Sequence, residues 1–176
     1  MRYERCLVMR EWKNEKRWME FWNDEKTARK NALNCEFCKH SIYEQLSNKE
    51  DIVFFYPARC WKAYAYLDSL QEAFSVTGQL YLSFNHLLFH GKFSIELRPV
   101  FFLYASDRKD ALEWKNRLLY VIKNVKEVRS DFETKIRRGC EGYESIFGPW
   151  QFWKEKMKVK YGENVEEFLK VMENVV

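Results

Sequence analysis

Two cysteines three positions apart, Cys35 and Cys38, have the spacing at which a protein chain commonly binds a metal. Structural zinc needs four sulfur or nitrogen ligands in tetrahedral reach, and a Cys-x-x-Cys pair is the usual half of such a site. The second half is missing at standard spacing, so the alternative is a pair of reduced thiols. The residues that could complete a Zn²⁺ site, if the fold brings them together, are His40, Cys60, Cys6 and Cys140.

Two histidines four positions apart, His86 and His90, would share one face if they lay on a helix. Their segment has the pattern of a turn, no Glu stands beside His86, and no third ligand is near, so the zinc-protease arrangement is absent. We expect both to be solvent-exposed turn residues. The sequence also lacks a Gly-rich phosphate loop, a Gly-x-Ser-x-Gly elbow and an acid-rich calcium loop, which argues against those classes.

The segments 79–84 and 93–103 alternate apolar and polar residues with the period of half-buried strands. We expect an antiparallel hairpin joined through residues 85–91, with Pro99 at a sheet edge or a bulge. One face would then offer donors and acceptors of the kind that read base edges in DNA, although any solvent-facing sheet looks similar. The candidate residues for this contact are Gln79, Tyr81, Ser83, Asn85, Lys92, Ser94 and Arg98.

A basic cluster follows toward the C-terminus, and it could contact phosphates beside the predicted hairpin. Acidic residues interleave with these cations, so the cluster has a mixed charge. Its members are Arg129, Lys135, Arg137 and Arg138.

These residues must be positioned by elements that the hydrophobic pattern predicts. Residues 7–32 have an apolar stripe at helical spacing and predict a helical arm, and a further helix is expected from 60 to 74. Ser106 or Asp107 would cap a helix that runs to about Lys123. Short strands are expected near 52–56 and 134–138, and two helices at the C-terminus, at 150–161 and 164–174.

The order of these elements predicts an α+β fold, with an antiparallel sheet of about four strands in two hairpins and helices covering one face. We expect two parts: a helical N-terminal arm with the Cys-x-x-Cys pair in residues 1–50, and the α+β domain in residues 51–176.

The segment that begins with Leu67, Leu70 and Glu72 and leads into the predicted hairpin resembles the LAGLIDADG homing-endonuclease family over roughly residues 64–158. The resemblance implies a motif helix at a twofold interface, divalent metal at its acidic end, and a sheet in the major groove of double-stranded DNA. The family's metal-binding carboxylate has no counterpart here, where Phe74 and Ser75 stand, so Glu72 with Asp68 would bind Mg²⁺. With one motif copy, the chain would act as a homodimer.

The amino-acid composition limits the classes of function that the protein can have. Among 176 residues, 30 Lys and Arg stand against 26 Asp and Glu, a net charge of +4 that permits a polyanionic partner without requiring one. No apolar run is long enough for a membrane span, and five cysteines favour a reducing, cytoplasmic location. We expect a DNA-binding protein of homing-endonuclease-like architecture, with or without nuclease activity. The alternative is a small non-enzymatic viral or plasmid factor that binds another protein.

Overall fold

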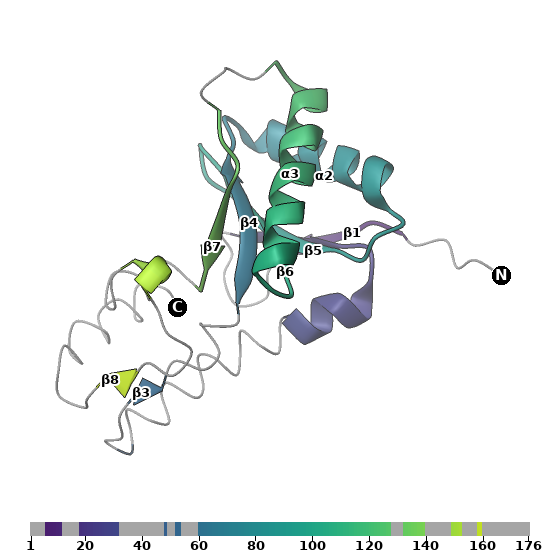
Figure 1. The fold of residues 1–176 in the computed structure, drawn as a ribbon. Helices are drawn as coiled ribbons and strands as arrows, with labels where there is room; N and C mark the ends of the chain where they lie inside the picture. Colours follow the sequence, from purple (N-terminus) through teal and green to yellow (C-terminus); the bar gives the residue numbers. More distant parts are fainter. Residues whose placement is uncertain are drawn as a thin grey trace.

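The computed structural model describes residues 6–11, 18–31, 48, 52–53, 60–127, 132–139, 149–152 and 158–159. Two long helices and a large sheet form most of this part of the chain (Figure 1). A short helix covers residues 25–31. The remaining elements are β1 (Val8–Glu11), β2 (Trp18–Trp22), β3 (Ile52–Val53), β4 (Trp61–Tyr66), α2 (Leu70–Phe84), β5 (His90–Ser94), β6 (Val100–Ala105), α3 (Arg108–Val125), β7 (Lys135–Arg138), the 3-10 turn η2 (Trp150–Phe152) and β8 (Lys158–Val159).

The fold is α+β. The main sheet has six strands in the order β1-β2-β5-β6-β4-β7, and every neighbouring pair is antiparallel. Strands β3 and β8 form a separate antiparallel pair. From β4 to β7 the chain runs β-α-β-β-α-β with strand order β5-β6-β4-β7, which is the split β-α-β, ferredoxin-like arrangement. The hairpin β1-β2 extends this sheet beyond β5.

The two faces of the main sheet differ in composition, because alternate residues of each strand point to opposite sides. Phe21, Gly91, Leu103 and Ala63 are successive register partners on what we call the first face, which carries α2 and α3. The next residues along the strands lie on the opposite, second face. That face carries aromatic and charged side chains: Trp18, Glu20, Trp22, Lys62, Tyr64, Tyr66, His90, Lys92, Phe102, Tyr104, Lys135 and Arg137.

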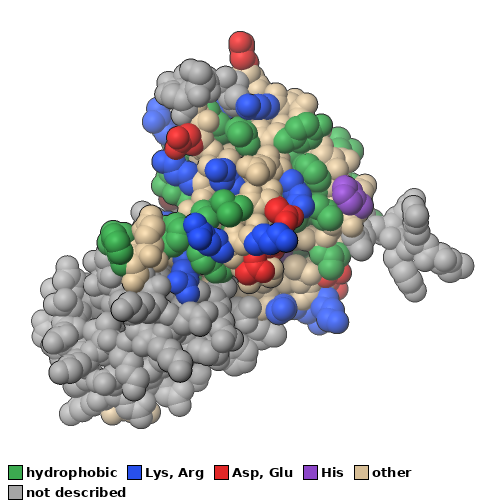
Figure 2. Space-filling model, viewed as in Figure 1, with side chains coloured by type: hydrophobic (Ala, Val, Ile, Leu, Met, Phe, Trp, Pro, Cys, Tyr) green, Lys and Arg blue, Asp and Glu red, His purple; other side chains and the backbone are tan. Residues whose placement is uncertain are grey.

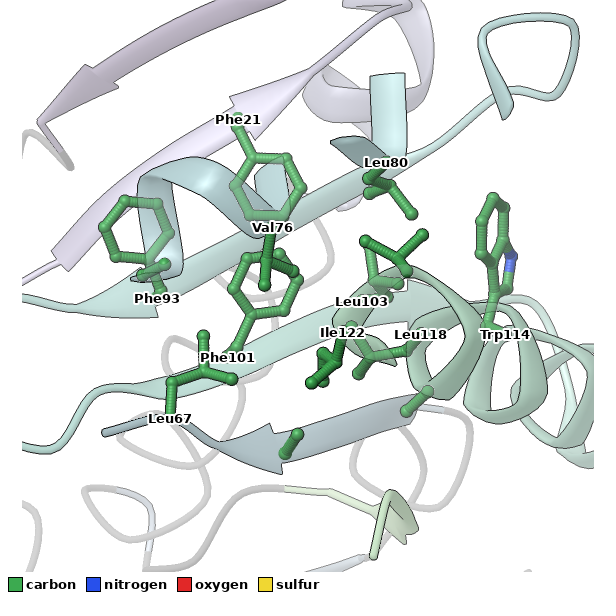
Figure 3. Packing of buried hydrophobic residues seen from close by; sticks show 14 of the residues in the cluster. Phe21, Leu67, Val76, Leu80, Phe93, Phe101, Leu103, Trp114, Leu118 and Ile122 are labelled. Atoms are coloured by element: carbon green, nitrogen blue, oxygen red, sulfur yellow. The ribbon is translucent and has the colours of Figure 1, made fainter. Parts of the chain in front are cut away.

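The hydrophobic core lies between the first face and the two helices (Figure 3). Phe21, Phe93 and Phe101 pack ring against ring, with centroids 5.0 to 6.1 Å apart. Helix α2 contributes Val76 and Leu80, and helix α3 contributes residues at helical spacing, so both helices bury one stripe. The residues of α3 in this core are Ala111, Trp114, Leu118, Val121 and Ile122.

Both helices begin at a capping side chain, which explains where they start. The hydroxyl of Ser69 accepts a hydrogen bond from the amide of Glu72, and the carboxylate of Glu72 reaches back to the amide of Asp68 at 2.7 Å. This is a variant of the Ser-x-x-Glu capping box, displaced by one residue. At α3 the carboxylate of Asp107 accepts from the amide of Asp110 at 2.9 Å.

A buried asparagine fixes the connection between α2 and β5. The side-chain amide of Asn23, which follows β2, donates to the carbonyl of Leu87 at 2.6 Å, and its oxygen accepts from the amide of Phe89 at 2.9 Å. These bonds join segments more than 60 residues apart in sequence. The loop after α2 is therefore attached to the end of β2, and β5 starts in register beside it.

The helix expected over residues 7–32 is wrong. Of the residues described in this range, 8–11 and 18–22 are strands that join the main sheet, and 25–31 are helical. Met19 and Trp22, which suggested one helical stripe, lie on opposite faces of β2: Met19 faces the core with Phe21, and Trp22 lies on the second face. The segment expected to form an arm thus extends the sheet of the α+β domain.

The strand expected at 79–84 is also wrong, since these residues form the second half of α2. Leu80 is fully buried, but Leu82, which would have shared its face in a strand, is 72% exposed. Residues 61–66, expected in a helix, form strand β4 between β6 and β7, whereas residues 70–74 of the same expected helix are helical and belong to α2. The hairpin is made instead by β5 and β6, and Pro99 lies in the short connection between them rather than at a bulge.

Other expectations are met in part. Helix α3 is confirmed from its Asp107 cap, and it continues to Val125. Strand β3 lies within the segment expected at 52–56, and β7 within 134–138, although β7 pairs with β4. The helix expected at 150–161 is wrong where residues are described, because 158–159 are a strand; the helix at 164–174 lies outside the described residues. No helix in the described ranges has the length and apolarity that crossing a membrane requires.

Candidate nucleic-acid interface

The interior of the second face is a buried polar cluster. The Nε2 of His90 lies 2.8 Å from the Oε1 of Glu20, and both side chains are at most 1% exposed. The ring of His90 stacks on Tyr104, with centroids 4.8 Å apart. The Nζ of Lys62 lies 5.4 Å above the Tyr104 ring and donates to the carbonyl of Gly139. Because these groups are buried and contact one another, they hold the strands together and are not a surface for a ligand.

The exposed part of the second face is a row of aromatic rings. Trp18 lies 5.9 Å from Phe102, Phe102 lies 5.8 Å from Tyr64, and Tyr64 lies 5.9 Å from Tyr66, measured between ring centroids. Tyr66 is 55% exposed, Trp18 and Tyr64 are half-buried, and Phe102 is buried beneath them. These four residues are called the aromatic strip below. The strip crosses the four strands β2, β5, β6 and β4, although no ring comes from β5.

Cations accompany this aromatic strip on two strands, β5 and β7. The Nζ of Lys92 on β5 lies 4.4 Å from the ring centroid of Trp18, within cation–π range. On β7 the guanidinium of Arg137 lies 6.0 Å from the ring of Tyr64, and the exposed Lys135 is the register partner of Tyr64. Along one row of register partners, the adjacent rings of Phe102 and Tyr64 lie between Lys92 and Lys135, and the row continues past Lys92 to the buried Glu20.

The connection between β5 and β6 brings a further cation to the end of the strip. The amide of Leu67 donates to the carbonyl of Pro99 at 2.8 Å, and the amide of Val100 donates to the hydroxyl of Ser94 at 2.9 Å. These bonds fix the base of the turn beside the end of β4, where Tyr66 lies. Arg98 is exposed in this turn, next to Glu96.

The residues expected to read base edges do not share one face, which corrects the prediction from the hairpin pattern. Gln79, Tyr81 and Ser83 lie on α2 in the helix layer, where the amide of Gln79 donates to the hydroxyl of Ser83, and Asn85 caps the end of that helix. Lys92 lies on the second face, on the other side of the sheet, and Ser94 there is only 2% exposed. Of the seven, only Lys92 and the nearby Arg98 accompany the aromatic strip.

The basic cluster is divided in the same way. Lys135 and Arg137 lie on the second face, but Arg138 points to the other side of β7 and stacks over Trp61 at 5.5 Å. Lys135 also lies 3.6 Å from the carboxylate of Glu133, which reduces its net charge contribution. Arg129 lies outside the described residues.

The two acidic candidates do not form a vacant metal site, because a lysine lies between them. The Nζ of Lys126 is 2.7 Å from the Oδ2 of Asp68 and 2.5 Å from the Oε1 of Glu72. The other oxygen of Glu72 accepts the amide of Asp68, so both oxygens of this buried carboxylate have partners in the capping box and the ion pair. An ammonium at this position repels a divalent cation, and the pair therefore does not fit Mg²⁺ in this arrangement.

The two carboxylates also raise the pKa of Lys126. Burial lowers the pKa of Lys126, but its hydrogen bonds to Asp68 and Glu72 and their charges raise the pKa more, so it stands above its ordinary value of 10.5. The cation is therefore retained through the physiological pH range.

Of the six candidate zinc ligands, the structure describes two, Cys6 and Cys60. Cys35, Cys38, His40 and Cys140 lie outside the described residues, Cys60 precedes β4 and is half-buried, and Cys6 is exposed. Within the described ranges, no three His, Cys, Asp or Glu side chains gather in a way that could hold a metal ion. His86 is exposed in the turn after α2, as expected, whereas His90 is buried against Glu20, so its expected exposure is wrong.

Sequence reasoning missed the aromatic strip, although a signal was present. Strand β4 reads Trp-Lys-Ala-Tyr-Ala-Tyr, in which the small residues Ala63 and Ala65 alternate with Lys62, Tyr64 and Tyr66. That alternation is typical of a strand with one close-packed face and one aromatic face. The preceding and following segments favoured a helix, and this concealed the short alternating stretch.

On the side of the described residues that carries α2 and α3, the ring of Phe84 lies 6.0 Å from that of the exposed Tyr120, and the guanidinium of Arg117 lies 4.8 Å from the ring of Trp114. Figure 2 shows the side on which α3 lies, where Lys and Arg side chains are dispersed among apolar and acidic ones. Comparison with family models, with curated proteins and with solved structures gave no match to this chain. The protein is therefore placed only by its fold: an α+β protein with a ferredoxin-like arrangement of elements and an aromatic, cationic second sheet face. Such folds serve many functions, so the function must be argued from the surface itself.

Proposed function

We propose that this chain is a nucleic-acid-binding protein, with DNA as the expected polymer, and that it binds on the second face of the main sheet. The observation that carries this proposal is the row in which the rings of Phe102 and Tyr64 lie between Lys92 and Lys135, with Lys92 also over the ring of Trp18. Phosphate groups are attracted by the cations, and sugars and bases can contact the rings between them.

The proposal is for binding, with no metal-dependent cleavage. The carboxylates that the homing-endonuclease resemblance offers as Mg²⁺ ligands already contact Lys126 and the first turn of α2. The proposed activity therefore needs no Mg²⁺, and addition of EDTA should leave binding unchanged.

The test is a titration of labelled DNA, measured by fluorescence anisotropy at two salt concentrations. Neutralised phosphates release counterions, so affinity should fall steeply between about 50 and 200 mM salt. The double variant Arg98→Ala/Lys135→Ala should bind more weakly and reduce the magnitude of the logarithmic salt slope by about 2, roughly one for each lost phosphate contact.

The matched control is Lys109→Ala/Lys123→Ala, which removes two exposed cations from α3 on the other side of the sheet. It should bind nearly as well as the wild-type protein. If this control loses affinity while the Arg98/Lys135 variant does not, the binding face is wrong. Absence of DNA binding at low salt would contradict the function itself.

A second candidate function, contact with a protein, is favoured by the outer side of α2. This helix has one charged residue, Glu72, which is buried, and its outward side includes Phe74 and Leu82, 39% and 72% exposed. An uncharged surface meets no like-charge repulsion when it packs against its own copy across a twofold axis. We propose the expected homodimer at this surface. Sedimentation should show a dimer that Leu82→Glu dissociates, and a wild-type monomer would contradict it.

A further inference from the structure

We infer that the aromatic strip selects unpaired nucleotides, so that the ligand of the second face is single-stranded nucleic acid and not a duplex. This inference rests on the proposed function and adds the class of polymer. It follows from the spacing, exposure and surroundings of four rings: Trp18, Phe102, Tyr64 and Tyr66.

The rings of the aromatic strip are farther apart than stacked bases. Neighbouring centroids in the strip are 5.8 to 5.9 Å apart. Successive bases along one strand of a duplex are only about 3.4 Å apart and are already stacked on each other. Because Phe102 is only 8% exposed, the neighbouring rings that a strand can reach are Tyr64 and Tyr66, whose planes are 83° apart. Bases stacked on these two rings cannot stay stacked on each other, which requires an unpaired strand.

The second face of the sheet presents the faces of its rings, and these suit unpaired bases better than a duplex. Paired bases present only their edges, inside grooves that are entered by a helix or a two-stranded ribbon. Here the accessible rings lie on a broad sheet: Tyr66 is exposed, and Trp18 and Tyr64 are half-buried. Phe102, which lies between Trp18 and Tyr64, is 8% exposed. The faces of these rings can stack against bases that have left the duplex, whereas paired bases present only their edges to the rings.

Cations lie around the rings of the aromatic strip. Lys92 covers Trp18 at 4.4 Å, and its flexible stem allows the ammonium to move from the ring to a phosphate when a base takes its place. Lys135 and Arg98 are exposed beyond Tyr64 and Tyr66. Positive groups thus lie at both ends of the strip, where the backbone of a bound strand would pass.

Acidic groups near the strip do not oppose this arrangement. Glu20 is buried in its pair with His90, and Asp68 beside Tyr66 is bound by Lys126 at 2.7 Å. Glu133 is exposed and lies near Lys135, where it moderates the charge at one end. Glu96 is exposed next to Arg98 and moderates the charge at the other end, so the acidic groups reduce the positive charge beside the strip without removing it.

The experiment compares a short oligothymidylate, the corresponding oligouridylate and a DNA duplex of the same length by anisotropy at low salt. The single strands should bind more tightly than the duplex. Tyr66→Ala should weaken single-strand binding about 5- to 100-fold, because one stacked base is lost, and Tyr66→Trp should restore it. The matched control is Tyr120→Ala on α3, which removes the same side chain at the same 55% exposure from the other side and should have no effect.

The outcomes separate the inference from the function on which it rests. Duplex binding as tight as single-strand binding, with no loss in Tyr66→Ala, would overturn the inference while nucleic-acid binding stands. No binding of any of the three probes would overturn both. A preference for oligothymidylate or for oligouridylate would support the inference and identify DNA or RNA as the source of the strand.

Discussion

Glu20 and His90 form a hydrogen-bonded pair across β2 and β5, with 2.8 Å between Oε1 and Nε2 and at most 1% of either side chain exposed. The pair lies at the centre of the second face and is covered on one side by the ring of Tyr104. Two polar side chains in such a place stabilise the sheet only while each has the other. This makes the pair a sensitive point of the fold, away from the exposed strip.

We therefore predict that Glu20→Ala or His90→Ala lowers the free energy of unfolding by about 3 kcal/mol, because either change leaves a polar group buried beside an emptied space. Replacing both, as in Glu20→Leu/His90→Phe, should recover most of the loss, since two apolar side chains leave no unpaired polar group. Urea unfolding followed by Trp fluorescence gives the comparison. Equal losses in the single and double variants would contradict a coupled pair.

Asn23 should be nearly as sensitive. Its amide and carbonyl bind the main chain at Leu87 and Phe89, at 2.6 and 2.9 Å. Asn23→Asp keeps the shape but replaces the donor by an acceptor, and burying that mismatch should lower the unfolding free energy by about 2 kcal/mol. In the Asn23→Asp variant, amide hydrogen exchange should accelerate relative to the wild-type protein, and it should accelerate more in the loop 85–89 than in α3. Uniform acceleration over both would mean that the asparagine does not act on this loop.

Gly91 and Gly78 form a matched pair of glycine tests. A β-carbon at Gly91 would overlap the ring of Phe21 and lie 2.5 Å from the carbonyl oxygen of Phe102. Gly91→Ala should therefore cost at least about 2 kcal/mol, because both neighbours are packed in the core. At Gly78 in α2 the same atom meets open space.

Gly78→Ala should in contrast stabilise the protein by about 0.5 to 1 kcal/mol, through the higher helix propensity of alanine. Thermal unfolding of the two variants measures both effects. A shift of the same sign in both would contradict the close approach of β5 to Phe21 and Phe102.

Lys126 predicts a defined dependence of stability on pH. Its pKa is raised in the folded protein, since its interactions with Asp68 and Glu72 outweigh its burial. A raised pKa means that the folded state holds the proton more tightly, so the contribution is complete below the ordinary pKa of 10.5 and is lost as pH rises through the folded pKa.

Lys126→Met should accordingly be less stable than the wild-type protein by about 1 kcal/mol at neutral pH. The difference should stay constant up to about pH 10 and shrink above it, where the wild-type lysine loses its charge. Urea unfolding from neutral pH to pH 11 measures this. A difference that is unchanged at the highest pH would show that the lysine acts by packing alone.

The sequence by itself determined those features that depend on neighbours along the chain. Asp107 caps α3, and the spacing of Ala111, Leu118 and Ile122 defines its buried stripe, so this helix could be predicted. The α+β class also followed from the mixture of periods. The burial of Phe93, Phe101 and Leu103 was visible from their alternation. The single strand expected over 93–103 was wrong, because residues 95–99 form the turn between β5 and β6 and Leu97 is 90% exposed.

Only the tertiary structure decided which segments became strands and which residues shared a surface. Residues 79–84 alternate like a strand, but α2 begins at Ser69 and continues through them because Val76 and Leu80 are buried against the sheet. The aromatic strip draws its rings from β2, β4 and β6. Strand β4 ends at Tyr66 and pairs with β6, which begins 34 residues later at Val100, and β2 ends at Trp22 and pairs with β5, which begins 68 residues later at His90. Pairing over such distances depends on the whole core, and no local pattern specifies it.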